Sequence, residues 1–442
     1  MSSEAAACAV GVPAVKKGHP KGLYVLFFTE MWERFCYYGM RTILVYYMTK
    51  SLLFSQEKSS QIYGLYTGLT YFMALFGGIL ADRVIGQRKA VILGGALMAV
   101  GEFMLMSKSL FFPGLFFLIL GVGALKPNIS TQVGSLYAQG DHRRDRAFSI
   151  FYVGINVGAF ISPLICGTIG ELYGWNYGFG AAGLGMILGL IIYLCGQKYL
   201  APDNTMKKKA AGEAAKKAGP MAHDDKSKIV ALLVLCLFNI VFWAIYEQQG
   251  NTLALWMDAN TNRHIFGWEM PATWFQSFNP IMIFAFTPLL TMFWARQAKR
   301  GKEPSSIAKM AIGCILGGLS FLVLIPAAGA YADHGSASVL WLVLNTAILT
   351  FGELYLSPIG LSLVTKIAPI RMVSMFMGLW FFAMFGGNYL CGFLGTFWEK
   401  MPKSDFFLML ALLSCGAGLG IFTVLKPLKK AIGHGHEETV DV

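Results

Sequence analysis

Eight charged side chains lie well inside long apolar runs of this chain. They are five glutamates and three cations: Glu30, Glu33, Arg34, Arg41, Glu102, Lys126, Glu247 and Glu353. An ionised side chain at the centre of a membrane helix costs about 2.5–3.5 kcal/mol on insertion scales, so eight of them need a reason. They either pair structurally and hold helices together or line a polar pathway, and their number favours the pathway. In a pathway, such groups carry protons or bind the charged ends of a solute.

The densest group of polar residues falls on one face of the first apolar run. Its members stand at offsets of 0, 3, 4, 7, 8 and 11 residues: Glu30, Glu33, Arg34, Tyr37, Tyr38 and Arg41. This spacing places side chains on one side of a helix, and a polar side should face protein or water rather than lipid. Burial disfavours the charged form of a carboxyl group, and a nearby arginine favours it. The Glu30–Glu33–Arg34 cluster is therefore where we expect a proton to bind and leave.

The composition explains why these charges are exceptional. Of the 442 residues, 55% are apolar and 14% are charged, the mean hydropathy is +0.55, and a soluble domain carries about 25% charged residues. This argues against a soluble enzyme, a disordered chain or a nucleic-acid-binding protein, and the net charge of +12 suits the basic cytoplasmic loops of a membrane protein. The eight cysteines form no CxxC pair, so we expect neither a disulfide framework nor a metal site. A polytopic protein of the lipid bilayer is predicted.

Twelve runs are long and apolar enough to cross a bilayer, since a spanning helix needs about 20 mostly apolar residues. They cover residues 22–49, 61–81, 90–107, 110–134, 147–170, 177–195, 229–255, 271–294, 307–329, 339–365, 374–397 and 404–426. Residues 1–19 lack the pattern of a signal peptide, so we expect the first run to act as its own insertion signal.

The placement of lysine and arginine predicts the orientation. Of the 36 basic residues, 27 fall in the two termini and the even-numbered loops, six in the odd-numbered loops and three inside runs. Both termini should therefore be cytoplasmic.

The sequence divides into five predicted parts. They are a cytoplasmic N-terminus (1–21), a six-helix bundle (22–195), a basic cytoplasmic linker (196–228), a second six-helix bundle (229–426) and a cytoplasmic tail (427–442). This is the layout of an all-α membrane protein with the major facilitator fold, twelve transmembrane helices in two bundles around a central site.

Two pairs of opposite charges lie at matched depths in corresponding helices of the two halves. Arg41 lies about 19 residues into the first run and Glu247 about 18 into the seventh, while Lys126 lies about 16 into the fourth and Glu353 about 14 into the tenth, counting from the start of each run along the chain. We expect two salt bridges between the bundles, Arg41–Glu247 and Lys126–Glu353, to act as alternating gates.

The charged residues inside the runs are five carboxylates and three cations, so two carboxylates have no cationic partner. None of the seven histidines lies in a run, so proton coupling must fall to carboxylates. For Glu102 we expect a structural or interfacial role rather than coupling.

Several motifs resemble those of the proton-dependent oligopeptide transporters, the POT family. The first run matches their ExxERFxYYG signature from Glu30 to Gly39, and the fifth matches FYxxINxG from Phe151 to Gly158. Further matches, in the order of the family, are Gly77–Gly86 with Asp82 and Arg83, Gly121–Asn128, Phe242–Gln248, Gln276–Pro280, Glu353–Pro358 and Met377–Phe381. The Gly77–Gly86 motif alone is shared by many facilitators, but ExxERF together with INxG and ExxxSP is specific.

The resemblance implies symport of di- and tripeptides with protons at the cell membrane by alternating access, with no cofactor besides the coupling proton. It implies that Arg41 and Lys126 face the peptide carboxylate, that Glu353 faces the amino group, and that Asn156 and Asn279 bind the backbone. Tyr37, Tyr38, Tyr71, Ser357 and Trp380 would complete the substrate site. Glu30, Glu33 and Arg34 would couple protons, while Arg41–Glu247, Lys126–Glu353 and Asp82 with Arg83 would act in gating. Tyr37, Tyr38 and Trp380 could instead be packing aromatics.

A free peptide suits this set of residues, because it is a zwitterion with a cationic end, an anionic end and a hydrogen-bonding backbone. Binding these shared groups between apolar and aromatic walls would tolerate many side chains. The alternative is transport of another small anion such as nitrate, for which Glu353 would meet no cationic end. A receptor or a membrane enzyme is a third possibility, disfavoured because the runs hold no nucleophile–base pair. The linker is too short for the two extra spans of many bacterial relatives, and the oligomeric state stays open.

Overall fold

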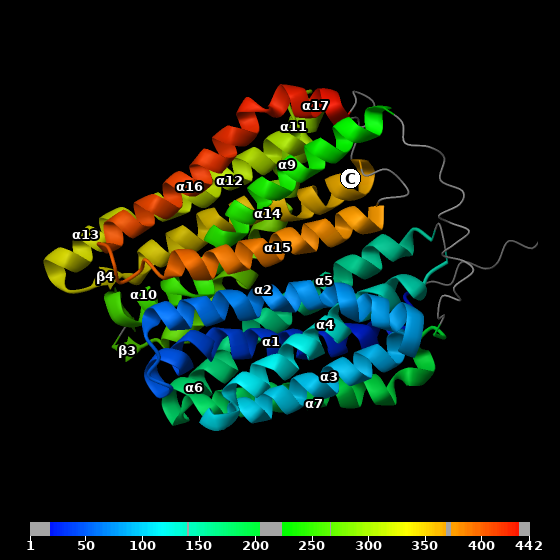
Figure 1. Ribbon diagram of the computed structural model, residues 1–442, viewed down its shortest axis with the longest axis horizontal. Helices are drawn as coiled ribbons and strands as arrows, with labels where there is room; N and C mark the ends of the chain where they lie inside the picture. Colours follow the sequence, from blue (N-terminus) through cyan, green and yellow to red (C-terminus); the bar gives the residue numbers. More distant parts are fainter. Residues whose placement is uncertain (1–17, 139–140, 204–222, 266, 368–372, 433–442) are drawn as a thin grey trace, which may run out of the picture.

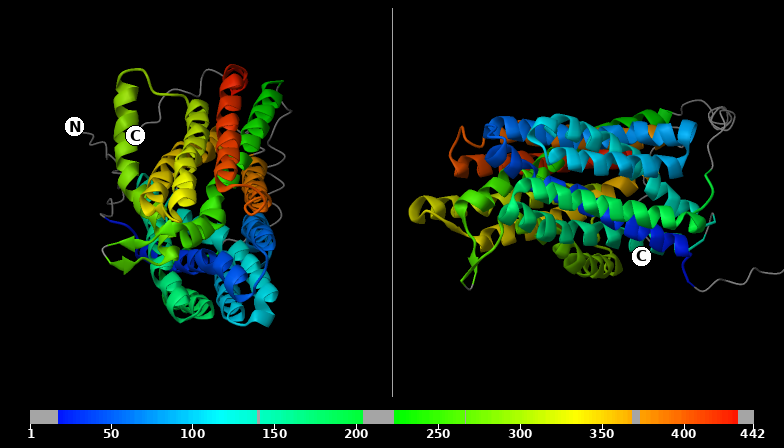
Figure 2. Two further views of the ribbon diagram at one scale, coloured as in Figure 1. Left: turned by 90° about the vertical axis from the view of Figure 1, so that its left-hand side faces the viewer. Right: turned by 90° about the horizontal axis from the view of Figure 1, so that it is seen from below.

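The computed structural model describes residues 18–138, 141–203, 223–265, 267–367 and 373–432. The middle of the predicted linker and most of both predicted termini therefore lie outside the described residues. Within them the chain is almost wholly helical, and its long helices run side by side in two bundles, one above the other in Figure 1. Seen from the left-hand end of that view, the two bundles remain separate layers of helices (Figure 2, left).

The N-terminal half forms the lower bundle of Figure 1, in blue to green. Its helices are α1 (Lys21–Tyr46), α2 (Gln56–Leu80), α3 (Gln87–Leu105), α4 (Phe111–Ser135), α5 (Arg143–Ser162), α6 (Thr168–Tyr173) and α7 (Trp175–Cys195). The C-terminal half forms the upper bundle. Its helices are α9 (His223–Tyr246), α10 (Thr252–Asn260), α11 (Phe278–Lys299), α12 (Ser306–Leu322), α13 (Leu324–His334), α14 (Val339–Ile367), α15 (Val373–Gly395), α16 (Lys403–Thr423) and α17 (Leu425–Ile432).

Each predicted apolar run coincides with one of these helices or with two consecutive ones. Ten helical stretches among the described residues are long and apolar enough to cross a membrane. The stretches built on α1 and α3 are not among them, because α1 carries the charged stripe and α3 carries Arg88, Lys89 and Glu102. The predicted all-α membrane fold is confirmed. The charges that indicated a polar pathway are also the reason why α1 is less apolar than these ten stretches.

Several helices are interrupted or bent beside residues of interest. Pro127 lies inside α4 directly after Lys126, and Pro358 lies inside α14 directly after Ser357. A proline in a helix interior removes one backbone hydrogen bond and kinks the helix. Between α5 and α6 the chain takes a π turn that begins at Pro163. Inside a bilayer such irregular backbone is tolerated where neighbouring helices can satisfy the freed groups.

The two bundles touch most closely where α2 crosses α15 (Figure 1). A Cβ atom added to Gly64 would lie 2.6 Å from the carbonyl oxygen of Asn388 and from the Cα of Gly392. Small residues let membrane helices approach until their backbones are in contact. The glycines therefore set the distance between the bundles along this seam.

The two ends of the molecule differ. Short strands mark one end, on the left of Figure 1, where β1 (Thr261–Asn262) pairs in parallel with β4 (Ala337–Ser338) and β2 (His264–Ile265) pairs antiparallel with β3 (Trp268–Glu269). We call this the hairpin end. The first described residues of the chain and α17 lie toward the opposite end, which we call the linker end (Figures 1 and 2).

Candidate functional site

A cavity of about 340 Å³ lies between the bundles, and both bundles line it. Most of the substrate-site residues predicted from the sequence face it, together with two of the predicted proton-coupling residues. They are Glu30, Arg34, Tyr38, Arg41, Tyr71, Lys126, Asn156, Asn279, Glu353, Ser357 and Trp380. Helices α1, α2, α4 and α5 supply one wall, and α9, α11, α14 and α15 supply much of the other. Residues more than 300 positions apart in the chain therefore meet in one chamber.

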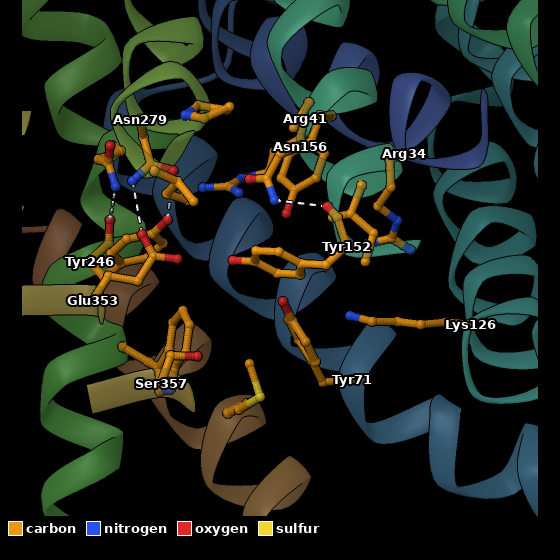
Figure 3. A pocket seen from close by; sticks show the side chains of 18 of the residues that line it. Arg34, Arg41, Tyr71, Lys126, Tyr152, Asn156, Tyr246, Asn279, Glu353 and Ser357 are labelled. Carbon is orange, nitrogen blue, oxygen red and sulfur yellow. Dashed lines mark hydrogen bonds between the residues drawn. The ribbon is translucent and has the colours of Figure 1, made fainter. Parts of the chain in front are cut away.

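Lys126 supplies the cationic side of the cavity. Its ammonium nitrogen lies 4.1 Å from the centre of the Tyr71 ring and forms no ion pair with any described residue. A cation over an aromatic face is attracted by the ring, more strongly where water is excluded. Figure 3 shows Lys126 entering the cavity from the wall opposite Glu353. The side chain is thus held against Tyr71 and has no ion-pair partner among the described residues, which leaves it available to an anion.

Glu353 supplies the anionic side and is held by neutral partners. The Nδ2 of Asn279 donates to a Glu353 carboxylate oxygen at 2.9 Å and also lies 3.0 Å from the Thr350 hydroxyl. The Tyr246 hydroxyl donates to Oδ1 of Asn279 at 3.2 Å (Figure 3). Among the described residues, Glu353 has no cationic partner. A buried carboxylate with amide support and no cation retains acceptor capacity for an ammonium group.

Arg34 holds the glutamates of the first helix. Its guanidinium forms ion pairs with Glu33 and with Glu30, the latter at 3.3 Å between Nε and Oε1, and it lies 5.3 Å and 6.0 Å from the centres of the Tyr37 and Tyr38 rings. A second hydrogen bond joins its Nη2 to Glu33 at 2.6 Å. One oxygen of Glu30 has no hydrogen-bond partner among the described residues. Glu30, which lines the cavity, is therefore the less satisfied carboxylate of the cluster.

The ion pair between Arg41 and Glu247 crosses the two bundles. The Nη2–Oε2 distance is 2.8 Å, and Nε of Arg41 donates to the Tyr63 hydroxyl at 2.7 Å. The pairing expected from matched depth is present in the structure. Lys126 and Glu353, the other expected pair, form no ion pair with each other here. Arg41 and Glu247 are thus joined, while Lys126 and Glu353 are apart.

Two residues of the predicted stripe on α1 do not face the cavity. Glu33 is fully buried, and Tyr37 packs in the core of the N-terminal bundle. At about 100° per residue, Glu30, Arg41, Arg34 and Tyr38 span about 0° to 80° around the helix, whereas Glu33 and Tyr37 lie at about −60° and −20°. The cavity sees only one edge of the stripe. The other edge faces the interior of its own bundle.

The loop residues Asp82 and Arg83 also lie away from the cavity. They belong to a π turn, Ala81–Ile85, that follows α2 toward the linker end. Neither residue is among those lining the chamber. Direct substrate contact by this motif was not predicted, and its gating role stays a prediction.

Several polar cavity residues were given no role in the site from the sequence, although three of them lie in the motifs above. Tyr152, Tyr246, Gln249 and Gln276 line the chamber. Tyr152 lies one helical turn before Asn156, whose Nδ2 donates to its backbone oxygen at 3.0 Å. A helical-period argument applied to Asn156 would have found it, since residues four apart share a face. Gln276 begins the Gln276–Pro280 motif, whereas Gln249 carried only the signal of an amide in an apolar run.

Glu102 lies outside the cavity, in the core of the N-terminal bundle. Its side chain is fully buried, and the Cys36 thiol donates to it at 3.3 Å from the side of α1 that faces α3. Of the five glutamates inside the apolar runs, Glu102 and Glu353 are the two that form no ion pair with a described residue. Only Glu353 is placed to meet a solute.

Two helical bundles enclosing a chamber with opposed charges define a membrane transporter. Comparison with known proteins agrees. The POT family profile matches residues 88–219 and 203–410. The peptide transporter YePEPT of Yersinia enterocolitica is 35% identical over 86% of this chain and 88% of its own length, and a di-/tripeptide transporter of Lactococcus lactis is 33% identical over 94% and 97%. A crystal structure of a POT peptide transporter with alafosfalin superposes with a TM-score of 0.86 at 33% identity, covering 94% of this chain and 96% of that one.

The chain belongs to the POT family. It is accordingly a multi-pass membrane transporter of the major facilitator fold and not an enzyme.

Proposed function

We propose that this protein imports di- and tripeptides together with protons by alternating access. The observation that carries the proposal is the opposition of Lys126 and Glu353 across one chamber, each without an ionic partner among the described residues. A zwitterionic peptide complements both charges at once, whereas a lone anion leaves Glu353 buried and unsatisfied. Peptide transport by the relatives from Yersinia and Lactococcus supports the same substrate class.

The chamber suggests how a peptide is bound. Its carboxylate approaches Lys126 and Arg41, and its amino group approaches Glu353, which Asn279 orients. The amides of Asn156 and Asn279 reach the peptide backbone. Tyr38, Tyr71, Ser357 and Trp380 surround the side chains. Since the charged walls are fixed, a longer peptide cannot place its two ends on both.

The ion pairs suggest how the two ends open in turn. Arg41–Glu247 closes the hairpin end in the present state. Lys126 and Glu353 would form the corresponding pair when the chamber has closed toward the linker end. Glu30 is the proton site of this proposal, because it faces the chamber and has an unpartnered oxygen. Its protonation leaves Arg34 with Glu33 as its only carboxylate and makes the chamber more positive for the peptide carboxylate.

The proposed location is the cell membrane, with both termini in the cytoplasm. The excess of lysine and arginine in the termini and even-numbered loops supports this orientation. The hairpin end then faces outward, and the linker end faces the cytoplasm.

Uptake into reconstituted vesicles tests the proposal. Labelled dialanine should accumulate when the outside is acidic, and an N-acetylated dipeptide, which has no cationic end, should compete poorly. Vesicles without a pH gradient provide the control. Uptake that ignores the gradient removes the coupling part of the proposal. Competition by nitrate but not by unlabelled dipeptide replaces the peptide with a small anion.

A further inference from the structure

Glu171 reaches from the N-terminal bundle to the start of a helix in the C-terminal bundle. It lies in α6, and its carboxylate accepts hydrogen bonds from the short 3-10 helix Ala272–Ser277 that leads into α11. The backbone N–H groups of Ala272 and Thr273 donate at 3.1 Å and 2.8 Å, and the Thr273 hydroxyl donates at 2.6 Å. The guanidinium of Arg263 lies 3.7 Å away. One carboxylate thus has four partners across the bundle interface.

These contacts suit a negative charge. The first N–H groups of a helix have no partner within the helix, and a carboxylate there satisfies them and interacts favourably with the helix dipole. Hydrogen bonds to an ionised acceptor are stronger than those between neutral groups. The Glu171 side chain is only 16% exposed, so solvent screens these bonds little.

The surrounding residues continue the same interface. The indole N–H of Trp274 donates to the Thr168 hydroxyl at 2.7 Å, and the Ser277 hydroxyl donates to the backbone oxygen of Phe160 at 2.8 Å. A Cβ atom on Gly167 would lie 2.3 Å from the Thr273 hydroxyl oxygen. Residues 160–168 of the fifth apolar run therefore contact the 272–277 helix at Thr273, Trp274 and Ser277.

The 272–277 helix also leads directly to Asn279, the residue that supports Glu353 in the cavity. Asn279, which donates to Glu353, lies two residues beyond Ser277 at the start of α11. A displacement of the 272–277 helix therefore moves the residue that orients Glu353.

We propose that Glu171 is a positioning residue that latches the hairpin ends of the two bundles together and holds Asn279 against Glu353 while this end is closed. The role rests on the alternating access of the proposed function. Opening the hairpin end must separate α6 from the 272–277 helix. It then frees two backbone donors that water has to satisfy, so the latch favours the closed state.

Four single substitutions distinguish the effect of the Glu171 contacts from that of nearby residues. Glu171→Ala removes every acceptor, and Glu171→Gln keeps one acceptor oxygen but loses the charge. Thr273→Val removes the hydroxyl donor and leaves the backbone N–H in place. Glu269→Gln is the matched control, because Glu269 also pairs with Arg263, at 2.7 Å, but belongs to the hairpin of the same half.

Pulsed electron resonance measures the opening directly. Spin labels at Ser109 and Ala332, one exposed residue near the hairpin end of each bundle, report the distance in a background whose eight cysteines are replaced. Losing bonds to a charged acceptor should raise the ratio of long to short distances about tenfold or more in Glu171→Ala, with smaller increases in Glu171→Gln and Thr273→Val. Glu269→Gln should match the unsubstituted protein.

Kinetics tests the link to Glu353. In Glu171→Gln the KM for dialanine should rise about threefold or more, while inhibition by an N-acetylated dipeptide stays unchanged, because only the free amine uses Glu353. Unchanged distances in both Glu171 variants overturn the proposal, and so does an equal shift in Glu269→Gln. The distance readout needs no substrate. A protein that carries no peptide but shows the shift keeps the latch and loses the proposed function.

Discussion

Replacing Glu247 with glutamine is expected to unlock the hairpin end of the protein. The Arg41 and Glu247 side chains are only 9% and 4% exposed, and their charged atoms lie 2.8 Å apart. At an effective dielectric constant of 20, the gross attraction at this distance is about 6 kcal/mol. Much of it offsets the desolvation of both groups. Removing one partner of a buried pair nevertheless costs about 3–5 kcal/mol, because the other charge stays buried without compensation.

This cost falls on the closed state, because water hydrates Arg41 once the hairpin end opens. A difference of about 3–5 kcal/mol changes the ratio of open to closed molecules by a factor of about a hundred to a few thousand. The same spin-label pair at Ser109 and Ala332 measures that ratio. Dipeptide uptake should fall steeply, since a protein trapped open on one side cannot complete its cycle.

A second ion pair between the same bundles provides the control. Lys50 and Asp258 lie 2.6 Å apart, but their side chains are 44% and 17% exposed. Exposed pairs contribute about 0–1 kcal/mol, so Asp258→Asn should shift the ratio by less than about tenfold. The double reversal Arg41→Glu with Glu247→Arg should recover part of the uptake lost in either single reversal. A shift of the distances in Glu247→Gln no larger than in Asp258→Asn would show that the Arg41–Glu247 pair does not hold the hairpin end closed.

Further predictions concern the chamber and the seam between the bundles. Lys126→Ala should raise the KM for dialanine about tenfold or more. Glu353→Gln should remove the preference for dialanine over its N-acetylated form. Competition assays with both peptides measure the preference, and an unchanged preference argues against the binding of the peptide amine by Glu353. Glu30→Gln should leave dipeptide exchange intact while uptake stops responding to a pH gradient, and a preserved gradient response would move the proton site elsewhere. Gly64→Leu should lower the thermal unfolding temperature, because a Cβ there would lie 2.6 Å from backbone atoms and overpacking costs about 1–3 kcal/mol or more. Gly416→Leu is the control and should change the unfolding temperature little, because a Cβ at Gly416 meets nothing within 4 Å.

Much of this architecture is local in origin, and the sequence therefore predicts it. A run of about 20 apolar residues must be a helix in a bilayer, since no other backbone arrangement satisfies its own polar groups. For this reason the positions of all twelve predicted runs coincide with helices. Arg41 and Glu247 could be paired from the sequence because depth in a membrane is counted along a helix, and both lie at the same depth in corresponding helices.

The rest depended on how helices are rotated and how the two bundles meet. The helical period places Glu33 and Tyr37 on the polar side of α1, but only packing decides that they turn into the bundle while Glu30 and Tyr38 face the chamber. The contact of Glu171 with Thr273 joins segments about a hundred residues apart through an unremarkable glutamate near a helix end.

Depth alone likewise could not decide whether Lys126 meets Glu353 or rests over Tyr71. An alternating-access protein has at least two arrangements of its bundles, and the same residues are paired in one and apart in the other. Hydropathy and helical period thus determined the helices and the residues available to the site. The tertiary structure decided which of those residues share the chamber and, apart from Arg41 and Glu247, which of them are joined. These contacts depend on the relative placement of two bundles, which no local pattern encodes.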